Sequence, residues 1–160
     1  MAKRSLGTEI KTLLSSLEEG FDHAAWHGPN LLTALRGVSA RQAAWRPGPD
    51  RHNIWELVVH LAYWKYRVRK RLVNGKRGEF PEPGTNWFRR ARGLTLKLWR
   101  RDLALLKQEN RRLRETVAQL DPARLRVVYK GRRLAEHVRG LAFHDIYHAG
   151  QIQLLKKLQS

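Results

Sequence analysis

The chain has 160 residues, enough for one domain with a hydrophobic core, and we expect residues 1–160 to form a single domain. Its 32 basic and 14 acidic side chains give a formal net charge of +18, spread over both halves of the sequence. The absence of cysteine excludes disulfides, thiolate zinc sites and cysteine nucleophiles.

No apolar run is long enough to span a bilayer, and residues 1–4 lead into an amphipathic pattern rather than a signal-peptide core. We therefore expect a cytoplasmic protein without a membrane partner. The positive charge would attract phosphates, nucleic acid and acidic small molecules whether or not binding them is the function. Because charged residues usually cover solvated helix faces, we favour a solvated surface over a binding function as the explanation of this charge.

Apolar residues recur at spacings of three and four from Ser5 to about Arg36, which predicts an amphipathic first helix. Gly28-Pro29 interrupts this pattern. Proline removes a backbone donor and crowds the preceding turn, so we expect a kink or a local break there. The sequence Ser39–Gln42 resembles a capping box for one short helical turn that ends near Trp45.

The second helix is predicted to start at Asn53, because a capping residue followed three positions later by Glu56 is typical of a helix N-terminus. It should run to about Val73. The following segment, residues 74–86, is rich in glycine and proline and should be irregular. Extended, it could reach about 43 Å, whereas the helix is about 32 Å long, so it could cross a bundle and make helices two and three parallel.

The third and longest helical pattern runs from Trp87 to about Leu120 and is ended by Asp121-Pro122. The segment 126–131 could be extended but lacks a partner run. A last helix is predicted from Leu134 to Leu158. Four helices without a convincing sheet indicate an all-α four-helix bundle with a long crossover between helices two and three.

The last helix carries His144 and His148 four residues apart, so both rings share one helix face and can converge on one metal ion. The best candidate for a third ligand is His60, within the apolar second helix. Three buried histidines are costly unless several nitrogens are satisfied together, which a divalent metal does. Structural histidines are the alternative. Gln151 and Tyr147 are near enough in sequence to orient a ligand, although Tyr147 points to a different face.

The other polar candidates are ranked lower. His137 lies on the same helix face as His144, but the two residues are about 10 Å apart along the helix axis, which is too far for them to coordinate one ion. His27 and His52 could line the mouth of a pocket, or be hydrogen-bonding residues of loops and helix ends. Glu56 could accept a hydrogen bond behind the site, act as a general base, or cap its helix, and we favour the cap.

The stretch His52–Trp64, together with His144–Ile152, resembles the DinB superfamily, which includes the YfiT-like metal-dependent hydrolases and thiol transferases. The similarity covers most of the chain. Residues 26–29 before Pro47-x-Pro49 also fit one branch of that superfamily. Asn53 stands where serine is commoner, a difference that preserves the capping role.

The resemblance implies a four-helix bundle with a crossover between helices two and three, often assembled as a homodimer. It also implies one divalent metal, nickel or zinc, on His60, His144 and His148. Three neutral imidazoles leave one or more positions for water or substrate, as in catalytic rather than structural sites. A water or thiol bound there would lose a proton near neutral pH.

Two functional hypotheses follow. The first is a metal-dependent enzyme acting on a small molecule, either a hydrolase or a transferase that uses a low-molecular-weight thiol. The second is a protein that binds nucleic acid or another anionic partner, with a structural or vestigial metal site. This second hypothesis rests on the net charge and on basic runs such as Lys65–Arg71 and Arg89–Arg92. It is not favoured, because no recognised nucleic-acid-binding motif is present.

Overall fold

The computed structural model describes residues 7–75, 79–89 and 95–160. Within these ranges the chain is mostly helical, which confirms the predicted all-α class. The helices are α1 (Thr8–Phe21), α2 (Leu31–Leu35), α3 (Ala40–Ala44), α4 (Ile54–Leu72), α5 (Leu96–Ala118), α6 (Pro122–Leu125) and α7 (Leu134–Lys157). A short hairpin of β1 (Val128–Tyr129) and β2 (Arg132–Arg133) precedes α7.

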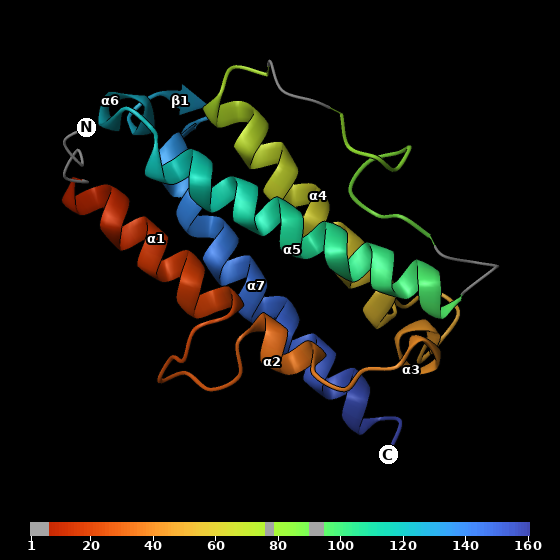
Figure 1. Cartoon of the computed structure of the whole chain (residues 1–160). Coiled ribbons are helices and arrows are strands. Elements are labelled where there is room, and N and C mark those ends of the chain that lie inside the picture. Colours follow the sequence, from red (N-terminus) through yellow and green to blue (C-terminus); the bar gives the residue numbers. More distant parts are fainter. Residues whose placement is uncertain (1–6, 76–78, 90–94) are drawn as a thin grey trace.

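Helix α4 packs against both α5 and α7, and α1 lies against α7 (Figure 1). Every residue of α4 from Ile54 to Tyr63 is buried. The indole of Trp55 donates to Asp102 of α5 over 2.8 Å, and further along both helices Arg69 pairs with Glu109. Because the two contacts advance in the same direction along both helices, α4 and α5 run parallel.

Side-chain caps begin α3 and α4 as predicted. Ser39 and Gln42 form a complete capping box at the start of α3. At the start of α4, Asn53 Oδ1 accepts the backbone N–H of Glu56 over 2.8 Å, and the helix ends close to the predicted Val73. Each cap satisfies a backbone donor that has no partner within its helix.

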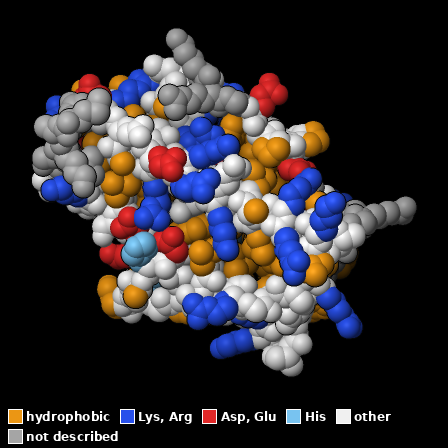
Figure 2. Space-filling view, viewed as in Figure 1, with side chains coloured by type: hydrophobic (Ala, Val, Ile, Leu, Met, Phe, Trp, Pro, Cys, Tyr) orange, Lys and Arg blue, Asp and Glu red, His pale blue; other side chains and the backbone are white. Residues whose placement is uncertain are grey.

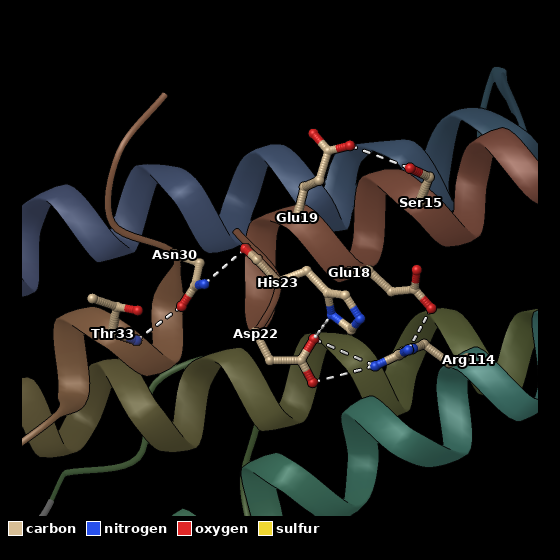
Figure 3. Close-up of polar contacts among 8 residues, drawn as sticks. All are labelled: Ser15, Glu18, Glu19, Asp22, His23, Asn30, Thr33 and Arg114. Atoms are coloured by element: carbon tan, nitrogen blue, oxygen red, sulfur yellow. Dashed lines mark hydrogen bonds and ion pairs between the residues drawn. The ribbon is translucent and has the colours of Figure 1, made fainter. Parts of the chain in front are cut away.

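The predicted first helix, residues 5–36, is divided by a longer break than expected. The interruption is not confined to Gly28-Pro29, since a loop of residues 22–30 separates α1 from α2. Asn30 ends this loop, and its Oδ1 accepts the backbone N–H of Thr33 over 2.9 Å (Figure 3). The loop therefore ends at a side-chain cap. Residues 5 and 6 of the predicted helix lie outside the described ranges.

Contacts from two other helices fix the end of α1. Arg114 of α5 forms ion pairs with Glu18 and Asp22 (Figure 3). On the opposite side, a Cβ added at Gly20 would lie 2.9 Å from the backbone oxygen of Ala142 in α7. Only glycine allows α1 and α7 to approach this closely.

The prediction that the third helix starts at Trp87 is wrong. Helix α5 begins at Leu96, where the hydroxyl of Thr95 accepts the backbone N–H of Leu98 over 3.2 Å. Trp87 lies in the preceding loop, and its neighbour Phe88 is buried against the core. Apolar spacing alone cannot distinguish a loop that packs on a core from another helical turn. Residues 90–94, which the prediction also covered, lie outside the described part of the chain.

The segment 126–131 does have a partner, contrary to the prediction. Val128–Tyr129 pairs antiparallel with Arg132–Arg133. Lys130 and Gly131 connect the strands with φ angles of 50° and 77°, the left-handed conformation that two-residue hairpin turns require. The hairpin is so short that its sequence carries no alternating pattern.

Basic side chains are scattered among hydrophobic and neutral ones on the face seen in Figure 1, rather than gathered into one stripe (Figure 2). None of the described helices combines the length and the apolar character needed to cross a membrane.

Candidate metal centre

Three histidines from two helices converge inside the molecule. His60 projects from α4, and His144 and His148 project from adjacent turns of α7. The Nε2 atom of His144 lies 3.0 Å from Nε2 of His60 and 2.9 Å from Nε2 of His148. One nitrogen of each ring lies within 4.8 Å of the others. The structure thus brings together the three residues singled out in the sequence, and this cluster could hold a metal ion.

Hydrogen bonds on the far side of two rings fix which nitrogen faces the cluster. Nδ1 of His60 lies 2.8 Å from the backbone oxygen of Asn86, and Nδ1 of His148 lies 2.5 Å from Oε1 of Gln151. Each oxygen is an acceptor, so each Nδ1 carries the proton. The Nε2 lone pairs of His60 and His148 therefore point into the cluster, as metal coordination requires.

Burial keeps the three imidazoles neutral. It lowers the pKa of His60 to about 4 and that of His144 to about 3, and it also lowers the pKa of His148. Neighbouring histidines add to the effect, because a second positive charge in the cluster is unfavourable. At neutral pH all three rings are thus in the form that binds metals.

The spacing of the nitrogens fits a small divalent ion. Nitrogen ligands about 2.05 Å from a tetrahedral zinc ion are about 3.3 Å apart. In the structure, the two separations of 2.9 and 3.0 Å are close to that value. Three protein ligands would leave a position for an exogenous molecule.

Trp87 forms part of the centre, although the apolar spacing of the sequence predicts it at the start of the third helix. Its indole stacks on the ring of His60 with centroids 3.9 Å apart, and on His52 with centroids 3.6 Å apart. The neighbouring Asn86 adopts a left-handed conformation with φ of 62°, and its side chain accepts a hydrogen bond from Trp64. This turn places the backbone acceptor for His60 and the covering indole side by side.

The interpretation of Glu56 as the second half of a capping box is wrong. Its carboxylate instead accepts hydrogen bonds from Arg46, at 2.5 and 3.1 Å, and lies 3.0 Å from Nδ1 of His52. His52 is thereby held against Trp87, which in turn covers His60. Glu56 therefore supports the wall of the site through Arg46 and His52 and is not a member of the cluster of metal-ligand candidates.

We predict that Glu56→Gln makes the free energy of unfolding depend less on pH under acidic conditions. Burial alone raises the pKa of Glu56, but the hydrogen bonds from Arg46 and His52 outweigh it and hold the pKa below its ordinary 4.5. Around this pKa the folded state therefore binds fewer protons than the unfolded state does. The ionised carboxylate contributes to the free energy of unfolding above pH 4.5, and this contribution is lost as pH falls through the pKa of the folded state. We expect Glu56→Gln to lower the free energy of unfolding by about 1–3 kcal/mol at pH 7 and by less at pH 3.

Urea unfolding at several pH values measures this effect. The exposed Glu9→Gln is a matched control and should retain the parental pH dependence. An equal loss for Glu56→Gln at pH 7 and pH 3 would show that the ion pair does not carry the effect.

The basic run Lys65–Arg71 is not a continuous surface. Lys65 is fully buried and pairs with Asp145 of α7 over 2.5 Å, and Arg69 is buried against Glu109. Burial raises the pKa of Asp145 to about 6, and the ammonium of Lys65 opposes that rise. The run thus contributes fewer exposed charges than the sequence suggested. Most of the second run, Arg89–Arg92, lies outside the described residues.

The remaining histidines do not join the cluster. His137 donates to the backbone oxygen of Tyr129 over 3.0 Å, consistent with its predicted distance from the site. In the described residues, no contact links His27 to the three histidines, and its Nε2 has no hydrogen-bond partner. His52 borders the site through Trp87, as the prediction of a pocket-mouth residue allowed.

Comparison with protein families yields a match that covers most of the chain. The family model of the DinB superfamily matches residues 23–152, which include α2, α4 and all three clustered histidines. Neither a curated protein nor a solved structure matches the chain significantly. The family match covers most of the chain, and the chain therefore belongs to the DinB superfamily.

Proposed function

We propose that this protein binds one divalent metal ion on His60, His144 and His148 and uses it in a thiol transferase or hydrolase reaction. The convergence of three neutral imidazoles carries the proposal, with the Nε2 lone pairs of His60 and His148 oriented toward the cluster. Without a metal, the single Nε2 proton that His144 could carry would serve only one of these two lone pairs well, whereas a divalent ion would satisfy all three rings together. Imidazole ligands suit both nickel and zinc, and we propose one of these two.

A divalent ion in this position would act as a Lewis acid and would lower the pKa of a coordinated water or thiol. The chain itself supplies orientation and shielding. Asn86 and Gln151 hold the rings of His60 and His148, and Trp87 covers one face of His60 against solvent. His144 is only partly buried, so the exogenous molecule would enter on its side.

We propose that α1, α4, α5 and α7 form the four-helix bundle of the superfamily, with a crossover between α4 and α5. The parallel contacts of α4 and α5 support this arrangement, because parallel neighbours need a connection that returns along the bundle. Residues 73–95 provide that connection.

We also propose a homodimer formed through α7. Four large apolar side chains of the C-terminal part of the chain are more than half exposed: Phe143, Tyr147, Leu154 and Leu158. Their spacing places them along one side of α7, where a second copy could cover them. Tyr147 also contacts the ring of His148, so this interface would border the metal centre.

An activity screen tests the enzymatic part of the proposal. The protein, loaded with zinc or nickel, would be mixed with low-molecular-weight thiols and a bimane electrophile, and separately with nitrophenyl esters. We expect turnover in one of these assays, and a return to the uncatalysed rate in His144→Ala/His148→Ala. If the loaded protein turned over none of these substrates, or the double variant retained the rate, the enzymatic proposal would fail.

A further inference from the structure

A pocket of about 300 Å³ lies where the C-terminal end of α4 meets the β-hairpin and α6. Figure 1 shows these elements together at one end of the molecule. The pocket is remote from the metal centre, because Arg71 lies about 16 Å beyond His60 along the helix axis. Its volume is at the lower limit for sites that bind small molecules.

The lining of this pocket is strongly basic. It includes Arg67, Lys70 and Arg71 from α4 and Arg124 from α6, and no residue of the lining is acidic. Within the described ranges, none of these four side chains forms an ion pair with a carboxylate. Four neighbouring positive charges repel one another, and a bound anion would relieve that repulsion.

The C-terminus of α4 does not repel an anion here, because Arg124 covers it. Its guanidinium donates to the backbone oxygens of Arg71 and Leu72, over 3.0 and 3.2 Å. These carbonyls form the negative end of the helix dipole, and the bound guanidinium offsets their charge. The charges of the three cations of α4 are therefore not offset by these carbonyls, although Lys70 donates one hydrogen bond to the hydroxyl of Tyr66 over 3.2 Å.

Arg71 is held in a fixed orientation beside an aromatic ring. His137 donates from Nε2 to the backbone oxygen of Tyr129, so its Nδ1 is free to face Nη1 of Arg71 at 3.5 Å. The guanidinium lies over the Tyr129 ring, 4.7 Å from its centroid, and its Nε has no hydrogen-bond partner. An oriented guanidinium with unused donors is suited to an oxyanion with several acceptors.

We propose that this pocket binds the phosphate group of a small phosphomonoester, with the organic part of the ligand against Tyr129. A phosphomonoester carries a charge of about −1.5 to −2 at neutral pH and three acceptor oxygens. It therefore matches three cations better than a carboxylate does. The small volume favours a small ligand over a continuous nucleic-acid backbone, and the proposal does not depend on the metal centre.

An NMR titration of the full-length chain with phenyl phosphate, at an ionic strength of about 0.15 M, tests this proposal. We expect the backbone amides of Gly75 and Tyr129 to shift, because both residues line the pocket. Benzoate, which carries one charge on the same ring, should bind about tenfold more weakly or worse. Shifts confined to other parts of the chain would overturn the proposal.

Two variants that each remove two positive charges distinguish specific binding in this pocket from attraction by the net positive charge of the protein. Arg67→Gln/Lys70→Gln removes two pocket cations that make no ion pair, and we expect affinity for phenyl phosphate to fall about tenfold or more. Lys97→Gln/Arg100→Gln removes the same two charges from the exposed side of α5 and should change affinity less than about twofold.

Equal losses in the two variants would overturn the proposal. So would the binding of single-stranded DNA or of phosphatidic acid vesicles without any binding of phenyl phosphate. Thermal unfolding of both variants checks that the fold is retained. If a variant unfolds, the shifts of Gly75 and Tyr129 in the parent protein still decide the question.

Discussion

Replacing Lys65 by methionine is expected to lower the free energy of unfolding by about 3–5 kcal/mol. The side chain of Lys65 is fully buried, and its ammonium lies 2.5 Å from Asp145 Oδ2. The substitution keeps the length and the apolar stem but leaves the carboxylate of Asp145 buried without its counter-ion. Because Asp145 Oδ1 already lacks a hydrogen-bond partner, no neighbouring group replaces the ammonium.

Urea unfolding of three variants tests this prediction. Lys65→Met/Asp145→Leu removes both charges and should recover most of the loss, because an apolar pair of similar volume often replaces a buried ion pair without cost. Arg111→Met breaks the exposed contact with Glu115 and should cost less than about 0.5 kcal/mol. A loss below about 1 kcal/mol for Lys65→Met would mean that Asp145 is not buried as described.

Replacing Gln151 by leucine is expected to weaken zinc binding about 10- to 100-fold. Gln151 Oε1 accepts the Nδ1 proton of His148 over 2.5 Å, and its Nε2 donates to the hydroxyl of Tyr147. Without that acceptor, His148 can rotate or protonate the nitrogen that faces the cluster. The substitution leaves all three imidazoles in place, so the expected effect is on affinity and not on the number of ions bound.

Competition with a zinc-binding dye measures this affinity. Gln153→Leu makes the same chemical change two residues further along α7, away from His148, and should leave zinc affinity within about twofold of the parent. Gln151→Glu retains the acceptor and should bind zinc at least as tightly as the parent. If Gln151→Leu and Gln153→Leu behaved alike, the hydrogen bond to His148 would have no role in the site.

The position of the histidines could be predicted from the sequence because it depends on local periodicity. His144 and His148 are four residues apart in an unbroken helix, so their common face follows from helix geometry alone. His60 required one further assumption, that a histidine within a long apolar helical run faces the core. The cluster of the three rings confirms that assumption. Metal binding itself is still a prediction.

The buried ion pairs could not be predicted, because each depends on a partner distant in the sequence. Lys65 and Asp145 are on different helices, as are Arg69 and Glu109. Within α4 alone, Lys65 and Arg69 look like any other members of a basic run. Only the packing of α4 between α5 and α7 shows that these charges lie inside the molecule.

The surroundings of His60 were missed for a related reason. Trp87 was assigned to a helix because its apolar neighbours continue the spacing of α5, whereas it lies in a loop that folds back over α4. The signal available in the sequence was Asn86 itself, because asparagine tolerates the left-handed conformation that it adopts here better than most residues do. Glu56 was misassigned because Arg46, from outside the helix, competes for its carboxylate.

Elemental analysis of the purified protein, prepared without a histidine tag and incubated with zinc and nickel, tests the central claim most directly. We predict about one ion per chain in the parent and in His23→Ala, and none in His144→Ala/His148→Ala. Metal in the double variant, or no metal in the parent, would contradict the account. The three histidines would then be core residues, and the enzymatic proposal would lose its mechanism.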